Sequence, residues 1–152
     1  MTTIAAPHMV LSAFASELYL KCLLCLEKGS VPQTHNLKAL FRDISTLAKK
    51  RIEQIWDAYA ASPGVQELWK FIESTTGKPF HRDFAAVLER SSTAFNELRY
   101  LHEDNSGSFL AGDLPQMLRT VILERRPLWA TLRHTPPTSH PRGKPVPSAK
   151  SA

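Results

Sequence analysis

Apolar residues recur at intervals of three and four over most of the chain, which is the spacing of a helix with one buried face. The pattern covers residues 9–28, 34–59, 65–72, 80–103 and 114–132. No stretch alternates apolar and polar residues in the way that a half-buried strand does. The sequence therefore predicts an all-α fold.

The first of these segments, residues 9–28, is apolar around most of its circumference. Glu17, Lys21 and Lys28 form only a narrow polar stripe, and Glu17 precedes Lys21 by four residues, which favours an ion pair. A helix of this kind is predicted to lie centrally in a bundle. Gly29 is predicted to end it at the C′ position.

The later helix boundaries depend on capping residues. Thr34 is a candidate N-cap for the second helix. That helix either runs on to Tyr59 or stops early, so that Ser45 caps a separate third helix, and the pattern leaves both open. Residues 80–103 form the longest predicted helix, and Asp113 is predicted to cap the last one.

The C-terminal part of the chain changes in composition. Pro127 is predicted to end the last helix, with Leu128 and Trp129 docking as a final turn. Residues 134–152 are rich in proline and in small and basic residues, so they cannot bury apolar surface and are predicted to be disordered. We therefore divide the chain into a helical domain, residues 1–133, and a basic, disordered tail.

The formal net charge of +5 is unevenly distributed. Arg142, Lys144 and Lys150 give the tail +3, which leaves 16 basic and 14 acidic residues, or +2, for the rest of the chain. A folded part so close to neutral is not a strong indication of nucleic-acid binding.

Cysteine usage and apolar runs bear on location. Cys22 and Cys25 are predicted to be buried as small apolar residues, because no second pair of Cys or His lies at the spacing of zinc ligands. The N-terminus lacks the basic start of a signal peptide, and the apolar run 18–26 is too short to span a bilayer. We expect a cytoplasmic protein with no membrane contact, no metal and no cofactor.

One segment near the end of the longest predicted helix places three ionisable residues on one helix face. Arg99, His102 and Glu103 occupy positions i, i+3 and i+4. A permanently charged guanidinium beside a group that titrates near neutrality suits the binding of a phosphate and the transfer of a proton. An exposed Arg99–Glu103 ion pair with an uninvolved histidine explains the same spacing.

Two blocks of the sequence resemble HEPN domains. Residues 14–24 lead through a Gly- and Pro-containing turn, residues 27–32, into residues 34–41, which begin Thr-His-Asn-Leu. This order resembles the opening of the family, and residues 95–103 resemble the helix that carries its polar motif. The resemblance spans about residues 9–130 and implies a bundle of four or five helices, often dimeric.

Many HEPN domains are metal-independent ribonucleases, in which an arginine and a histidine act together. By resemblance, Arg99 would neutralise charge on the scissile phosphate, His102 would act as general base or acid, and Glu103 would orient the imidazole. Two residues separate Arg99 from His102, against four to six in catalytic members, and the helical spacing still puts both on one face. Tyr100 and His35 are the candidate substrate contacts.

The resemblance thus implies a dimeric domain that binds RNA or a nucleotide. Its function would be that of a ribonuclease in a toxin–antitoxin or phage-defence system, with a cognate antitoxin encoded by a neighbouring gene. The alternative is a catalytically silent protein–protein interaction module. In that module, Arg99, Tyr100 and Glu103 form a polar cluster that fixes the register of the bundle or dimer, and His35 bonds loop backbone at a helix start.

Overall fold

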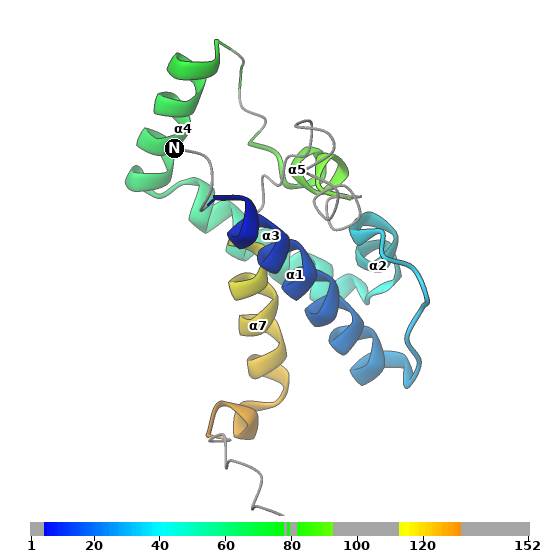
Figure 1. Cartoon of the computed structure of the whole chain (residues 1–152). Helices are drawn as coiled ribbons and strands as arrows, with labels where there is room; N and C mark the ends of the chain where they lie inside the picture. Colours follow the sequence, from blue (N-terminus) through cyan, green and yellow to red (C-terminus); the bar gives the residue numbers. More distant parts are fainter. Residues whose placement is uncertain (1–4, 78, 80–81, 93–112, 132–152) are drawn as a thin grey trace, which may run out of the picture.

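The structure is a computed structural model that describes residues 5–77, 79, 82–92 and 113–131 (Figure 1). Every regular element in these residues is helical, which confirms the all-α prediction for this part of the chain. The elements are α1 (Ala5–Lys28), α2 (Leu37–Asp43), α3 (Thr46–Ala60), α4 (Pro63–Thr76), α5 (Phe84–Arg90), α7 (Leu114–Arg125) and a short 3-10 helix, η1 (Pro127–Thr131). The predicted tail lies outside the described residues.

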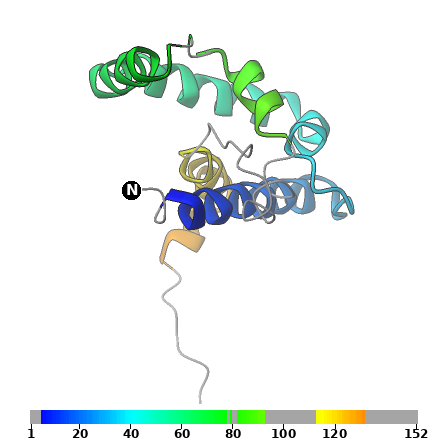
Figure 2. The same cartoon turned by 45° about the horizontal axis from the view of Figure 1, so that its top comes forward.

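The described helices form two packed layers. α1 packs against α7 and α2, and α3 packs against α7, α4 and α5. Figure 2 shows α3 and α4 lying above the layer that α1 and α7 form. All six α-helices contribute to one apolar core, whose most buried members include Leu20, Leu24, Leu40, Ile52, Trp56, Val87 and Leu118.

The first helix starts and stops close to the predicted positions. Gly29 follows α1 with a φ of +69°, a left-handed conformation that glycine adopts without strain, and its N–H donates to the Cys25 carbonyl at 2.9 Å. Burial is one-sided, however. The second half of the helix turns Leu20, Leu23 and Leu24 into the core, while an opposite face exposes leucine and phenylalanine side chains.

The segment His8–Lys28 of α1 is long and apolar enough to cross a membrane, by length and composition alone, with a mean hydropathy of 1.7. This stretch is longer than the apolar run over residues 18–26. Core helices and signal sequences pass the same test, and 39% of the most apolar window is buried inside the protein. Packing against α7 and α2 therefore accounts for much of the apolar character of α1.

The structure resolves the two alternatives for the second helix in favour of two separate helices. Ser45 has extended backbone and its side chain accepts a hydrogen bond from the Ala48 N–H, so it caps α3. The cap of α2 is Asn36, whose side chain accepts from the Ala39 N–H, and not Thr34 as predicted. The Thr34 hydroxyl instead accepts a hydrogen bond from the Asn36 N–H at 3.1 Å.

The prediction of one long helix over residues 80–103 is wrong within its described part. α5 ends at Arg90, and Ser91 and Ser92 form a turn. The Ser92 carbonyl accepts a hydrogen bond from the Leu37 N–H at 3.0 Å, so it is engaged with the start of α2 instead of with its own helix. Residues 93–112 lie outside the described part of the chain.

Two predictions of burial are also wrong. Cys22 is half-buried and Cys25 is exposed, because the face of α1 that turns into the core is the one that carries Leu20, Leu23 and Leu24. Burial, followed by the nearby Cys25 thiol, raises the pKa of the Cys22 thiol above its usual value. Pro127 ends α7 as predicted, but Leu128 in η1 is 79% exposed and Trp129 is also exposed, so this turn is not docked.

A polar junction ties three helices together at one end of the molecule. Glu27, near the end of α1, accepts hydrogen bonds from the N–H and the hydroxyl of Ser45, both at 2.7 Å. Arg125, at the end of α7, donates to the same carboxylate through Nη1 and to the Ser45 hydroxyl through Nη2 at 3.2 Å. The junction therefore joins α1 to the start of α3 and to the end of α7.

The Glu27 junction should make stability depend on pH in the acid range. Burial raises the pKa of the Glu27 carboxyl, but the Ser45 and Arg125 donors outweigh it, so the pKa lies below its usual value of 4.5. A depressed pKa contributes stability that is present above the unfolded pKa and is lost as the pH falls through the folded one. We expect Glu27→Gln to lower the free energy of unfolding by about 1–3 kcal/mol at neutral pH.

The measurement is urea unfolding of both proteins between neutral pH and pH values well below 4.5. The difference between Glu27→Gln and the parent should shrink towards the acid end. Glu53→Gln, on the exposed surface of α3, is the matched control and should change little at either pH. A Glu27→Gln effect that does not vary with pH would contradict the proposed ionisation.

Candidate functional site

Glu17 is the one charged residue that is buried in the part of the chain that the structure describes, with 2% of its side chain exposed. It lies in the middle of α1, next to the buried Ser16. An ionised carboxyl removed from water is destabilising unless hydrogen-bond donors or positive charges surround it. We call Glu17 and the side chains that contact it, where α1 meets the loop before α2, the α1–α2 junction. The contacts of Glu17 show which chemistry this junction can support.

Two nitrogen atoms meet the same oxygen of Glu17. Lys21 Nζ lies 2.8 Å from Oε1 within α1, which confirms the ion pair predicted from the spacing. His35 Nδ1 lies 2.9 Å from Oε1 and comes from the loop before α2. The His35 side chain is 50% exposed, so the pair joins a buried carboxylate to an imidazole at the surface.

We assign the tautomer of His35 from these contacts. The Lys21 ammonium has only donors, so Glu17 Oε1 accepts a hydrogen bond from it. In this assignment the same oxygen also accepts from His35, so the proton between them lies on Nδ1 of the imidazole. In the neutral ring Nε2 is therefore the basic nitrogen, which is the tautomer that a general base or a phosphate-binding histidine needs when a carboxylate supports it.

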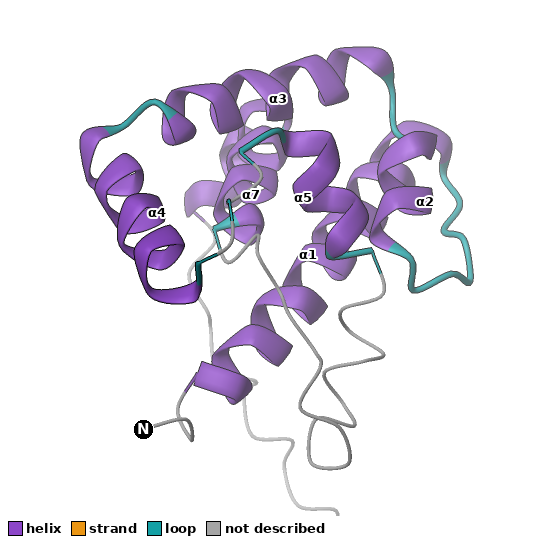
Figure 3. Ribbon diagram, turned by 90° about the horizontal axis from the view of Figure 1, so that it is seen from above, coloured by secondary structure: helices purple, strands orange, loops and turns teal. Residues whose placement is uncertain are grey.

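Two buried polar atoms near this junction have no hydrogen-bond partner among the described residues. One is Glu17 Oε2 and the other is the hydroxyl of Ser91. The hydrogen bond from Leu37 to Ser92 brings the end of α5 beside the start of α2, only two residues from His35 (Figure 3). Buried groups without partners are rare in folded proteins, so this junction has unused capacity for hydrogen bonds.

The predicted catalytic residues Arg99, His102 and Glu103 lie outside the described residues, as does the predicted substrate contact Tyr100. His35 is the one predicted site residue that the structure describes. Ser92, the last described residue before residues 93–112, accepts a hydrogen bond from the Leu37 N–H at the start of α2.

The sequence did not lead us to predict that Glu17 contacts His35. It assigned Glu17 only to a polar stripe with Lys21. A usable signal was present, because a carboxylate within a helix that is apolar around most of its circumference must find a second partner from another element. That this partner is His35, 18 residues further along the chain, follows only from the tertiary structure.

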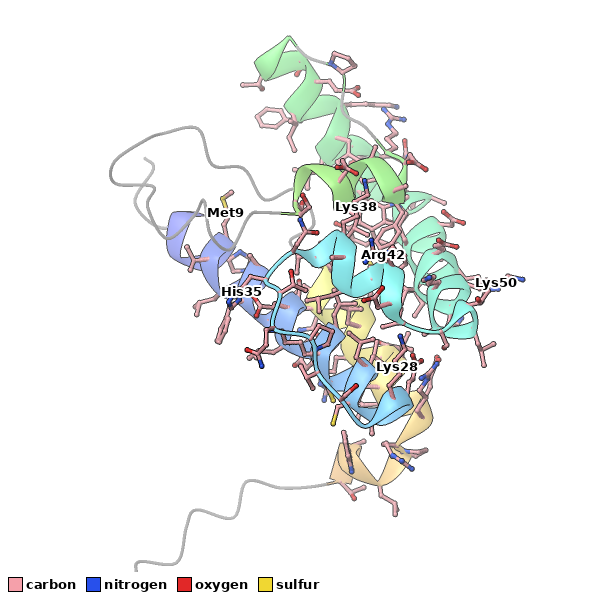
Figure 4. All side chains as sticks on the ribbon, turned by 90° about the vertical axis from the view of Figure 1, so that its right-hand side faces the viewer. Met9, Lys28, His35, Lys38, Arg42 and Lys50 are labelled. Carbon is pink, nitrogen blue, oxygen red and sulfur yellow. The ribbon has the colours of Figure 1, made fainter. Side chains whose placement is uncertain are left out.

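A cationic surface lies around α2, next to the junction. Residues 28–53 contain six basic and two acidic residues, a local charge of +4 that the value of +2 for residues 1–133 conceals. Figure 4 shows Lys28, Lys38, Arg42 and Lys50 around α2 on one side of the molecule, with His35 at its edge. We call the side chains of Lys28, Lys38, Arg42, Lys49 and Lys50 the α2 cationic surface.

Tyr59 and Asp113 form a second polar contact, between α3 and the residue that precedes α7. The Tyr59 hydroxyl donates to Asp113 Oδ2 at 2.5 Å, beside a pocket of about 230 Å³. Burial, and then the Asp113 carboxylate, raise the pKa of the phenol well above its usual value. The phenol therefore stays protonated near neutral pH and serves to hold the two elements together.

Metal ligands do not gather in the part of the chain described here. Within residues 5–77, 79, 82–92 and 113–131, no group of three or more His, Cys, Asp or Glu side chains is arranged to hold a metal ion.

No protein-family model, curated protein or solved structure matches this chain. The class that the fold and the junction define is an all-helical protein with a carboxylate–imidazole pair at its surface. The resemblance to HEPN domains rests on the two sequence blocks alone.

The tautomer of His35 is a direct test of the geometry. Glu17→Leu removes the acceptor for the Nδ1 proton, so we expect His35 to lose its preference for the Nδ1–H tautomer. Glu17→Gln keeps an acceptor oxygen and should keep the preference. The measurement is ¹⁵N NMR of the ring nitrogens at a pH where the imidazole is neutral. His8, exposed on α1, is the internal control, and an Nε2–H tautomer of His35 in the parent would refute the assignment.

Proposed function

We propose that this chain is an RNA-binding helical domain of the HEPN type, acting in the cytoplasm, and that the α2 cationic surface contacts the RNA backbone. The observation that carries the proposal is the grouping of Lys28, Lys38, Arg42 and Lys50 around α2 (Figure 4), within a segment, residues 28–53, whose formal charge is +4. Clustered lysine and arginine side chains neutralise phosphates and release counterions, which supplies most of the affinity of sequence-independent binding.

Part of this surface keeps its positive charge available. Lys38 is paired with Glu89, and Arg42 lies 3.2 Å from Asp43. Lys28, Lys49 and Lys50 form no ion pair with any described residue. Three uncompensated ammonium groups around one helix favour an anionic partner over a neutral one.

The Glu17–His35 pair supports a ribonuclease activity at the edge of this surface. We propose that His35 contacts the substrate together with Tyr100, and that Arg99, His102 and Glu103 carry the cleavage. In this scheme Arg99 stabilises charge on the phosphate and His102 transfers a proton. The activity would be that of a metal-independent toxin or defence ribonuclease.

A second candidate function, a protein–protein interaction module, is favoured by a different observation. Leu11 and Leu18 are exposed on α1 and lie at i and i+7, which places them on one helix face. An exposed apolar stripe of this kind is typical of an interface. A second copy of the chain or a cognate antitoxin would cover it.

The electrostatic part of the proposal predicts a defined salt dependence. Lys50→Ala should weaken RNA binding and should lower the slope of log affinity against log salt by about 1, because one phosphate contact is lost. The measurement is fluorescence anisotropy of a labelled RNA between about 50 and 200 mM salt. Lys70→Ala, an exposed lysine on α4, is the matched control and should change neither quantity.

The catalytic part of the proposal predicts cleavage without metal. The purified protein should cut RNA in the presence of a chelator, and Arg99→Ala and His102→Ala should each abolish cutting while the melting temperature stays nearly unchanged. If the residues are structural, the same changes should instead lower stability by about 1–3 kcal/mol, as expected for a buried group left without its partner. A parent protein that neither cuts nor binds RNA would decide for the interaction module.

A further inference from the structure

A groove of about 350 Å³ lies between α2, α3 and α5, on the side of the molecule that carries the α2 cationic surface. Its apolar lining comes from Phe41 on α2 and from Phe84 and Leu88 on α5. Lys38 and Arg42 of α2 and Lys49 of α3 stand around it. The groove thus combines an apolar lining with three cationic side chains from two helices.

The apolar lining is held by a network of aromatic rings. The Phe41 and Phe84 rings meet edge to face, with centroids 5.2 Å apart and an interplanar angle of 67°. Phe84 also packs on Trp56, at 5.4 Å between centroids, and the Trp56 indole N–H donates to the Arg82 carbonyl at 3.0 Å. Phe84 and Trp56 belong to the core and Phe41 packs against it, so the fold itself holds these rings in place.

Three cationic and two acidic side chains line the groove. Glu89 neutralises Lys38, and Glu53 is the second carboxylate of the lining. The Lys49 ammonium donates to the backbone carbonyl of Arg42 at 2.5 Å, which orients it without cancelling its charge. The Arg42 side chain is 74% exposed beside it. The lining residues sum to +1, but Arg42 Nε also lies 3.2 Å from Asp43 Oδ1, so Lys49 is the lining cation that has no carboxylate partner among the described residues.

We infer that this groove holds an unpaired base of bound RNA, with Arg42 and Lys49 contacting the adjoining phosphates, so that the protein prefers single-stranded to double-stranded RNA. This inference rests on the proposed RNA-binding function. An unstacked base offers an apolar face to an apolar lining, and its phosphate offers charge to the cations. In a duplex, by contrast, the base faces are already stacked, so only the backbone can be contacted.

Ala85 provides a test that leaves the charges and the core intact. It lines the groove from the exposed side of α5, so Ala85→Trp would fill the groove with an indole ring. Ala58→Trp, at an exposed position of α3 that does not line the groove, is the matched control. Thermal melting checks that both variants are folded. The probes are a fluorescein-labelled single strand of ten uridines and a labelled RNA duplex of the same length.

The expected result is that Ala85→Trp weakens binding of the single strand by at least about ten-fold and leaves duplex binding unchanged, as expected when a base contact is lost. Ala58→Trp should bind both probes as the parent does. If Lys50→Ala weakens binding but Ala85→Trp does not, the groove inference is overturned and the cationic surface stands. If the parent binds neither probe at low salt, the proposed function fails and the inference falls with it. Binding of poly-glutamate that is lost in Ala85→Trp, with RNA binding unchanged, would assign the groove to an acidic peptide instead.

Discussion

The buried carboxylate of Glu17 constrains how the first two helices meet. A charged group in the interior of α1 must be surrounded by donors, and one of these is His35, in the loop that leads to α2. The contact therefore fixes the loop against α1 and sets the place where α2 begins. α2 in turn carries Lys38 and Arg42 of the cationic surface and one wall of the groove.

The same principle operates at the other end of α1. Glu27 meets Ser45 and Arg125, so a second carboxylate joins the end of α1 to the start of α3 and the end of α7. The two junctions differ in whether every carboxylate oxygen has a hydrogen-bond donor. Both oxygens of Glu27 accept hydrogen bonds, whereas Glu17 Oε2 has no partner among the described residues. A fully satisfied polar junction stabilises a fold, and one with spare capacity suits a site.

Two surfaces with different chemistry result from this arrangement. Around α2, ammonium groups without carboxylate partners lie beside an imidazole held by Glu17 and a groove lined by Phe41 and Phe84. Along α1, an apolar face is exposed at Leu11 and Leu18. The first surface suits an anionic polymer and the second suits a protein, so the two candidate functions can belong to different faces of one molecule.

Helical periodicity alone determined the all-α class and the positions of most helices, because a 3.6-residue repeat of apolar positions needs no knowledge of what it packs against. Gly29 also acted through local backbone geometry, so its role could be read from the sequence. The sequence left open whether Ser45 caps a separate helix, and the structure decided that it does. The end of α5 at Arg90 could not, because it depends on the Ser92 carbonyl bonding to Leu37 of another helix. The pairing of Glu17 with His35 and the grouping of the cations around α2 likewise depended on tertiary contacts, since residues far apart in the chain meet only after the helices pack.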